Sequence, residues 1–417
     1  MEQNQIAAAA DHLLTERKLK QNMSYKLAVT ANFMFLIVCS LLLACTVAYA
    51  QQSSGITDAC NTSTDSPLER ARLLRMPQAI DTQNAEFENE SFYNEHGSLI
   101  QEAWKEWEIE HATTLSILND DVKEQGWIET SLAKAIDDAF TNPSEETEAA
   151  VKSLWTNNKK GTNKVLPKGV YATQLLSPRG VSYLRNLFDL ASTSGIPTRR
   201  PNGMNRYGVI LDSNVHGAVP VQPLVEAVEE IIDRIVRPVG RMLFQDRIGC
   251  EDDMDYYAFT ISYDGTSASS TQSKDMELKE HRDASVVTLN INLNLPEEEY
   301  GGSDVFFRGY PAADGWSSSD FFAENSRDED GGGTVSFSPG TAIIHLGAHR
   351  HGSLPITTAH SDSNSEGKQT SGGKRFNLVI WMFGKNGDVR IAPYSEEEQL
   401  TIKERWHCAI KGRMNII

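Results

Sequence analysis

Residues 281–290 read His-Arg-Asp-Ala-Ser-Val-Val-Thr-Leu-Asn. Two polar residues that flank an arginine lead into a β-branched, apolar run, which is typical of a strand that enters a protein core. In an extended strand the side chains of residues i and i+2 lie on the same side, so His281 and Asp283 can converge on one metal ion while Arg282 points away. A lone His-x-Asp is more often a surface ion pair, and the chain has ten histidines. The metal interpretation therefore depends on the residues that follow.

A histidine-rich turn follows a strand-like apolar segment further along the chain. It reads His345-Leu-Gly-Ala-His349-Arg-His351. We expect one of the three histidines to be a distal metal ligand and the others to orient ligands or to be structural. The pattern alone does not choose among them. Two histidines and one carboxylate on one face of Fe(II) would leave positions open for other ligands.

An arginine begins the next strongly apolar segment, Arg375-Phe-Asn-Leu-Val-Ile-Trp-Met. Taken alone, an arginine at a strand end is most often a surface charge. Downstream of a His-x-Asp pair and a distal histidine, Arg375 becomes a candidate anchor for a dicarboxylate, because a planar guanidinium can bind a carboxylate through two parallel hydrogen bonds.

Short strands dominate the chain after residue 256. We expect them at 257–263, 285–295, 303–307, 335–337, 341–346 and 376–383, with long loops at 310–333 and 359–374. Many short strands indicate an antiparallel sandwich or barrel rather than a parallel sheet. Ser177 and Pro178 predict the start of a helix that runs to about Ala191, and residues 224–244 are amphipathic. The sequence therefore predicts an α+β fold, with a double-stranded β-helix (jelly-roll) core and packed helices.

Residues 27–50 carry no charged side chain and are long enough to cross the roughly 30 Å apolar core of a membrane. Basic residues precede this segment, so the positive-inside rule places residues 1–26 in the cytosol and the rest in the lumen. Ala48-Tyr49-Ala50 allows the alternative of a cleaved signal peptide. We expect a single-pass type II membrane protein of the endoplasmic reticulum or Golgi, or alternatively a secreted protein.

The middle of the chain is richer in acidic residues and lacks the strand pattern of the C-terminal part. Residues 51–165 are predicted to form an acidic stalk that becomes helical from about Ser98. A globular domain over 166–390 and a tail at 391–417 follow. The formal net charge of −18 argues against nucleic acid as a partner. The cysteines beyond the apolar segment are odd in number, which leaves their pairing open; they are Cys60, Cys250 and Cys408.

Several motifs together resemble the procollagen-lysine and prolyl 4-hydroxylase class of 2-oxoglutarate-dependent oxygenases. They are the run 281–290, Gly301-Gly302 ahead of a strand, and 345–351 followed by Leu354-Pro355. The resemblance covers roughly 171–384. It implies an Fe(II)- and 2-oxoglutarate-dependent dioxygenase that hydroxylates a peptidyl lysine or proline and releases succinate and CO₂. It also implies ascorbate as a further cofactor.

The same resemblance implies His281, Asp283 and His351 as iron ligands. His351 matches the family's distal ligand better than His349 because it stands directly before a Gly-Ser-Leu-Pro segment. These three residues and an arginine would then make up the catalytic set.

Co-substrate contacts follow from the resemblance as well. Arg375 corresponds to the residue that binds the far carboxylate of 2-oxoglutarate, with Asn290 and Tyr263 as further contacts. The chain departs from the family through an insertion at 359–374 and a long loop at 310–333. Both would flank the mouth of the site, so they bear on the substrate more than on the chemistry.

Two alternatives belong to other functional classes. One is a non-catalytic jelly-roll membrane protein that binds a metal or a ligand, and the other is a zinc hydrolase that uses the same histidines. Arg375 and Asn290 favour the oxygenase over both. The choice between lysine and proline, the target protein and the oligomeric state are not specified by the sequence.

Overall fold

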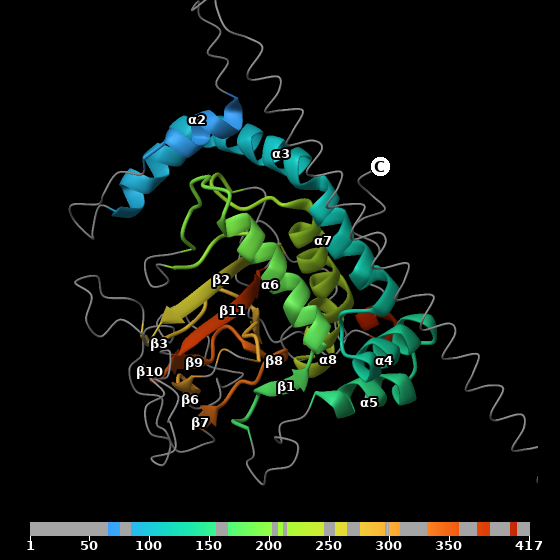
Figure 1. The fold of residues 1–417 in the computed structure, drawn as a ribbon. Helices are drawn as coiled ribbons and strands as arrows, with labels where there is room; N and C mark the ends of the chain where they lie inside the picture. The colour runs from blue at the N-terminus through green and yellow to red at the C-terminus, as the bar shows by residue number, and fades with distance from the viewer. Residues whose placement is uncertain are drawn as a thin grey trace, which may run out of the picture. The chain divides into compact units, whose positions relative to one another are not determined.

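Two antiparallel β-sheets make up the core of the computed structural model of this chain (Figure 1). The structure describes residues 66–75, 85–155, 166–201, 207–211, 215–245, 255–264, 276–296, 298, 300–308, 332–357, 373–383 and 401–406. All of these belong to one unit, Asp65–Ile417.

The first sheet has five strands in the order β1-β8-β4-β11-β2. They are β1 (Tyr171–Gln174), β8 (Thr341–Leu346), β4 (Val287–Asn292), β11 (Lys374–Met382) and β2 (Tyr256–Asp264). The second sheet has the order β3-β9-β6-β7. Its strands are β3 (Leu278–His281), β9 (Arg350–Ser353), β6 (Val305–Arg308) and β7 (Gly333–Val335). Two short strands, β5 (Gly301–Gly302) and β10 (Ile356–Thr357), pair separately.

The order of strands along the chain accounts for the architecture. Apart from β1 and the two-residue strands, β2, β4, β8 and β11 lie in the first sheet, and β3, β6, β7 and β9 lie in the second. The chain therefore alternates between sheets in the manner of an eight-stranded jelly roll. This confirms the expected antiparallel sheets with packed helices.

Helices cover one face of the five-stranded sheet. They are α6 (Pro178–Ser192), α7 (Gln222–Ile231), a π-helical turn η1 (Ile232–Val236) and α8 (Arg237–Leu243), with α3 (Ala85–Gln125), α4 (Thr130–Thr141) and α5 (Glu145–Leu154) alongside them (Figure 1). Leu289 of β4 and Leu378 of β11 belong to the same hydrophobic core as Leu184 and Ile231 on the helices. Because side chains alternate along a strand, the opposite face is left to line the space between the sheets.

Local sequence explains where these helices begin. The Ser177 side chain accepts a hydrogen bond from the Gly180 amide (3.1 Å), and Pro178 occupies the first turn of α6, as predicted. The amphipathic segment at 224–244 is also helical, with a π-helical turn at its centre.

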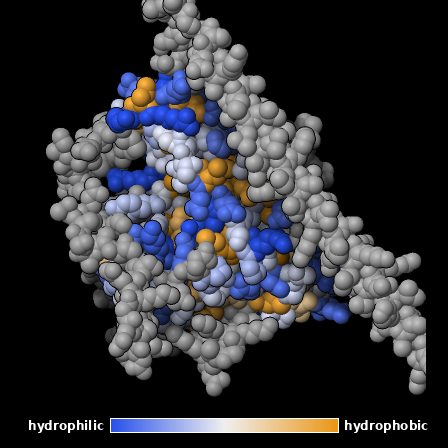
Figure 2. All heavy atoms as spheres, viewed as in Figure 1, coloured by the Kyte–Doolittle hydropathy of each residue, from blue (hydrophilic) through white to orange (hydrophobic). Residues whose placement is uncertain are grey.

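On the face seen in Figure 2, hydrophilic and hydrophobic residues are interspersed.

The segment before residue 98 differs from the expected solvated stalk. Helix α2 (Pro67–Leu73) and the first turns of α3 are regular, and Leu68, Phe92 and Tyr93 lie in the main hydrophobic core. Their apolar residues are few and widely spaced, so no periodic pattern marked them in the sequence.

Several predictions fall outside the described residues. They include the apolar segment 27–50, most of the predicted loops 310–333 and 359–374, and Cys60, Cys250 and Cys408. Within the part of the chain that the structure covers, no helix combines the length and apolar character that crossing a membrane requires.

Candidate functional site

Three predicted ligands converge between the sheets. His281 ends β3, His351 lies in β9, and the pairing of these strands places the two residues opposite each other. His281 Nε2 lies 3.2 Å from Asp283 Oδ1, and His351 Nε2 lies 3.6 Å from Asp283 Oδ2. One potential ligand atom from each residue falls within 4.8 Å of the others. The described residues contain no other such group of histidine, cysteine and acidic side chains.

The backbone orients both imidazoles. His281 Nδ1 lies 2.8 Å from the Lys279 carbonyl oxygen, and His351 Nδ1 lies 2.8 Å from the His349 carbonyl oxygen. In a neutral imidazole whose Nδ1 donates to a carbonyl, Nε2 carries no proton, so both Nε2 atoms can bind a metal once the rings are neutral. Two imidazole nitrogens and a carboxylate suit Fe(II), and the residues therefore fit that ion.

Asp283 reaches this position in a way that differs from the expected single strand. Strand β3 ends at His281, and Asp283 lies in the connection before β4. Its amide donates to the Gly347 carbonyl oxygen (2.9 Å), and its Oδ2 accepts from Thr288 Oγ1 (2.6 Å). A Cβ at Gly347 would lie 2.1 Å from the Ser285 carbonyl oxygen. The two connections are therefore in close contact, and this contact places the carboxylate.

The electrostatics keep the carboxylate ionised. Burial alone would raise the pKa of Asp283, but in the metal-free site the electrostatic interaction with the His351 ring and the hydrogen bond with His281 outweigh it and hold that pKa well below its usual range. Burial lowers the pKa of His281, yet its hydrogen bond and charge interaction with Asp283 raise the pKa overall. Burial lowers the pKa of His351, and it lowers the pKa of His345 to about 3. Neutral His351 and an anionic Asp283 are the forms that bind a metal.

Arg375 lies in the same cavity as His351. The cavity is formed by both sheets and is also lined by Tyr263, Asn290 and His345. The Arg375 side chain is buried, and no carboxylate among the described residues lies within ion-pairing distance of it. Burial lowers the pKa of Arg375, and the neighbouring Tyr263 partly opposes this effect. The predicted strand-end arginine is thus a buried cation rather than a surface charge.

Uncharged groups hold the guanidinium from one side. Its Nε donates to Asn377 Oδ1 (3.1 Å), and its Nη1 donates to Ser303 Oγ and Ser353 Oγ (3.0 Å each) and to the Ser303 carbonyl oxygen. None of the described residues accepts a hydrogen bond from Nη2. An anionic ligand would therefore supply both a hydrogen-bond acceptor and a counter-charge.

The other two predicted contacts also line this cavity. Asn290 Oδ1 accepts from Asn377 Nδ2 (2.6 Å). Tyr263 pairs with Arg375 across the β2–β11 ladder, and the guanidinium carbon lies 5.4 Å from its ring centre. Their proximity to Arg375 is observed, whereas their contact with a co-substrate stays a prediction.

Sequence reasoning missed four residues of this site: Thr288, Ser303, Ser353 and Asn377. Asn377 could have been predicted from the sequence, because a residue two positions after Arg375 in a strand lies on the same face of the sheet. Ser303 and Ser353 belong to segments that only the fold brings together, and neither carries a local signal. His349 is buried with its ring 4.9 Å from that of Phe307 and is not one of the three grouped residues.

No family model matches this chain. It is 26% identical to "2-oxoglutarate and iron-dependent oxygenase domain-containing protein 2" of Xenopus tropicalis, over 58% of this chain and 56% of that protein. It is 28% identical to the Arabidopsis thaliana oxygenase domain-containing protein ICU11, over 44% of this chain and 36% of that protein. The matches thus span from about a third to just over half of the relatives' length.

A prolyl-4-hydroxylase structure from Pseudomonas putida is similar to 60% of this chain and 97% of its own, with 14% identity and a TM-score of 0.30. Both curated relatives are described as 2-oxoglutarate and iron-dependent oxygenase domain-containing proteins. The metal-binding group of this chain is a separate observation, made from its structure. The chain is thus similar to proteins that are described as 2-oxoglutarate- and iron-dependent oxygenase domain-containing proteins.

Proposed function

We propose that the protein is an Fe(II)- and 2-oxoglutarate-dependent dioxygenase. The observation that carries the proposal is the buried guanidinium of Arg375, which shares a cavity with His351 and has no carboxylate partner among the described residues. A metal-binding group alone would suit many reactions. A metal-binding group beside a buried cation suits a chelating co-substrate with a second carboxylate.

The residues divide into two roles. His281, Asp283 and His351 would hold Fe(II), and Arg375 would bind the far carboxylate of 2-oxoglutarate. When bound, iron and 2-oxoglutarate supply the oxidising chemistry with O₂, which releases succinate and CO₂ and adds oxygen to a C–H bond of the substrate. Ascorbate would keep the iron reduced.

The chain's own contribution is orientation and exclusion of water. Asn377 bonds to both Arg375 and Asn290, so one amide aligns the guanidinium with the neighbouring strand. Phe307 and Ile343 are buried and form apolar parts of the cavity wall. A charge-assisted hydrogen bond is stronger in such surroundings than in water, which favours an anion at Arg375.

A steady-state assay with a matched arginine control tests this proposal. Arg375→Lys keeps a positive charge but loses the planar fork, and we expect the KM for 2-oxoglutarate to rise roughly tenfold or more, because hydrogen bonds to charged groups contribute about 1.5–3 kcal/mol. Succinate release with Fe(II) is the measurement. Arg185→Lys is the control, since Arg185 is also buried but pairs with Glu298 outside the cavity (2.7 Å).

Asp283→Ala completes the test because it removes the only carboxylate of the metal-binding group. We expect iron-dependent succinate release to disappear while the protein remains folded. An unchanged KM in Arg375→Lys, or undiminished turnover in Asp283→Ala, would contradict the proposal.

For the substrate we propose a lysine or proline side chain of a polypeptide. The support is the sequence resemblance around 281–290 and 345–351. Succinate release stimulated by proline peptides but not lysine peptides, or the reverse, would decide between them. Stimulation by neither peptide class would count against a peptidyl substrate.

We also propose that the domain acts in the lumen of the secretory pathway, on the strength of the uncharged segment 27–50 and the basic residues before it. Asn61-Thr-Ser and Asn89-Glu-Ser are glycosylation acceptors in that compartment. Sensitivity of the cellular protein to a glycosidase, lost in an Asn61→Gln/Asn89→Gln variant, is the expected result. A protein without N-linked glycans in which both sequons face the cytosol in a protease-protection assay would contradict it.

A further inference from the structure

A cavity of about 370 Å³ lies among the helices, apart from the site described above. Its walls come from the end of α3, the following turn, α4, α6, α7 and η1, and none of its lining residues lines the cavity of Arg375. Trp127 and Tyr183 form aromatic walls and are 6% and 5% exposed, with ring centres 6.1 Å apart. Aromatic faces attract both cations and the aliphatic stems of long side chains.

The polar lining is predominantly anionic. Asp137, Glu226 and Glu230 reach the cavity, against one guanidinium, that of Arg234. Arg234 pairs with Glu230 (2.7 Å) and with Asp137, so its charge is already matched. Glu226 accepts a hydrogen bond from Gln222 (3.1 Å), and no cation among the described residues lies within ion-pairing distance of it.

The environment of Tyr183 reflects this excess of negative charge. Burial raises the pKa of Tyr183 to about 12, and the neighbouring charges of Glu226 and Glu230 act in the same direction. Trp127 Nε1 donates to Glu230 Oε2 (3.3 Å), which links the aromatic wall to the carboxylates. The three carboxylates would repel an anion at this place and attract a cation.

We propose that this cavity binds the side chain of a lysine or arginine from a basic polypeptide. The aromatic walls would contact the aliphatic stem, and Glu226 and Glu230 would bind the charged head. The carboxylates lie near solvent, since the Asp137 and Glu230 side chains are 61% and 35% exposed, so a residue carried by a polypeptide backbone can reach them. The net charge of −18 adds long-range attraction for a basic partner. This inference does not depend on the proposed oxygenase activity.

The Trp127 indole gives a local probe for this site. Protein labelled with ¹⁵N-tryptophan would be titrated with Ac-Gly-Gly-Lys-Gly-Gly-NH₂, its arginine analogue and its glutamine analogue, and the Trp127 resonance would be assigned with Trp127→Phe. We expect saturable shifts with the lysine or arginine peptide and none with the glutamine peptide, because the cation competes for Glu230. Equal shifts with the glutamine peptide, or no shift with any peptide, would overturn the proposal.

Charge variants locate the effect. Glu226→Gln should weaken binding by about two- to fivefold, the range for a partly exposed charge pair, and Glu226→Lys should weaken it further. Glu229→Gln is the matched control, since it removes the same charge from the same helix outside the cavity lining. Equal losses in Glu226→Gln and Glu229→Gln would show that peptide binding depends on the overall negative charge of the protein and not on the cavity. Free n-butylamine that binds as tightly as the lysine peptide would contradict a polypeptide partner.

Discussion

Asp283 shows how single residues determine the metal-binding group. Thr288 donates to its carboxylate, Ser285 and Thr288 are themselves hydrogen-bonded (2.8 Å), and Gly347 accepts from its amide. The identities of His281, Asp283 and His351 were predictable because their residue types and spacing carry chemistry. Thr288 was not, because a threonine in a strand is ordinary, and only the folded connection brings it to Asp283.

The hydrogen bond from Thr288 can be tested by substitution with valine, which keeps the β-branched shape. We expect Thr288→Val to lower Mn(II) or Fe(II) affinity by roughly tenfold, as is usual when a residue that orients a metal ligand is lost. Calorimetric titration of the metal-free protein is the measurement. Thr173→Val, a buried threonine on β1 outside the site, is the control. Equal affinities in Thr288→Val and the unaltered protein would show that Thr288 has no part in orienting Asp283.

The pH dependence of metal binding follows from His281. Burial alone would lower its pKa, but the interaction with Asp283 holds that pKa above the ordinary value in the metal-free protein, so as pH falls a proton occupies the imidazole that the metal needs, and does so at a higher pH than in a free histidine. The sign is therefore that affinity falls as pH falls, by up to about tenfold per unit once His281 is protonated. Metal titrations between pH 8 and 6 test this. An affinity that rises toward acid would be incompatible with ligation by His281.

At the level of secondary structure, ion pairs on the outer face of the four-stranded sheet join the strands that carry the metal-binding histidines. Glu280 of β3 pairs with Arg350 of β9 (2.5 Å) and with Arg308 of β6 (3.4 Å). Because side chains alternate along a strand, Glu280 and Arg350 lie directly behind His281 and His351. The pairing therefore joins the two strands that carry the imidazoles, whose ring centres are 4.4 Å apart.

Substitution of Glu280 by glutamine tests whether this ion pair helps to position the histidines. We expect a loss of a few-fold in metal affinity with little change in thermal stability, because an exposed ion pair is worth about 0.2–1 kcal/mol. The charge-exchanged variant Glu280→Arg/Arg350→Glu should recover part of the affinity, because it restores the pair with position 350 but places a second cation beside Arg308. Glu277→Gln is the control because Glu277 precedes β3 and has no ion pair among those described. A double variant no better than Arg350→Glu alone would refute this role.

Elements differ in how far the sequence predicted them. The predicted 341–346 coincides with β8, and 257–263 lies within β2, because both are apolar runs long enough to stand out. Strand β3 was missed as a separate element, since it has only four residues and carries a lysine and a glutamate. The start of α3 was missed for lack of a periodic apolar pattern. Tertiary packing, rather than local preference, stabilises both segments.

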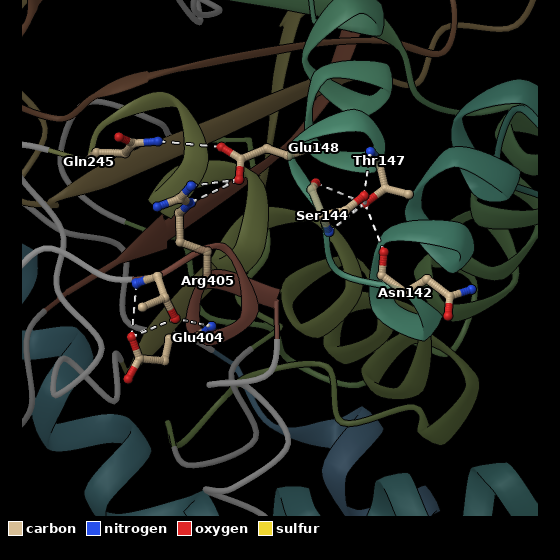
Figure 3. A network of polar contacts seen from close by, with 8 residues as sticks. Asn142, Ser144, Thr147, Glu148, Gln245, Glu404 and Arg405 are labelled. Carbon is tan, nitrogen blue, oxygen red and sulfur yellow. Dashed lines mark hydrogen bonds and ion pairs between the residues drawn. The ribbon is translucent and has the colours of Figure 1, made fainter.

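At the scale of the whole molecule, the residues before the jelly roll pack against residues that follow it. Glu148 of α5 accepts hydrogen bonds from Arg405 (2.6 and 3.2 Å) and from Gln245 (3.4 Å) (Figure 3). Trp406 is fully buried, with its ring 5.7 Å from that of Phe140. No spacing in the sequence could have paired Glu148 with Arg405, because only the complete fold brings them together.

Arg405→Ala tests this long-range contact. Glu148 and Arg405 are both buried, and removal of one partner leaves an uncompensated charge, so we expect unfolding to become easier by about 3 kcal/mol. Urea denaturation is the measurement. Glu148→Leu/Arg405→Met should recover most of the loss, and Arg179→Ala, from an exposed ion pair, is the control. A loss no larger than that of Arg179→Ala would mean that the contact contributes little.

We propose that Arg375 and the His281-Asp283-His351 group bind 2-oxoglutarate and Fe(II) together. The most direct measurement is visible absorption of the anaerobic protein with Fe(II) as 2-oxoglutarate is added, since chelation of Fe(II) by a 2-oxo acid produces a charge-transfer band and needs no substrate. We predict a saturable band in the unaltered protein, a weaker affinity for 2-oxoglutarate in Arg375→Lys and no band in Asp283→Ala. Iron-loaded, folded protein that gives no band at any 2-oxoglutarate concentration would contradict the account.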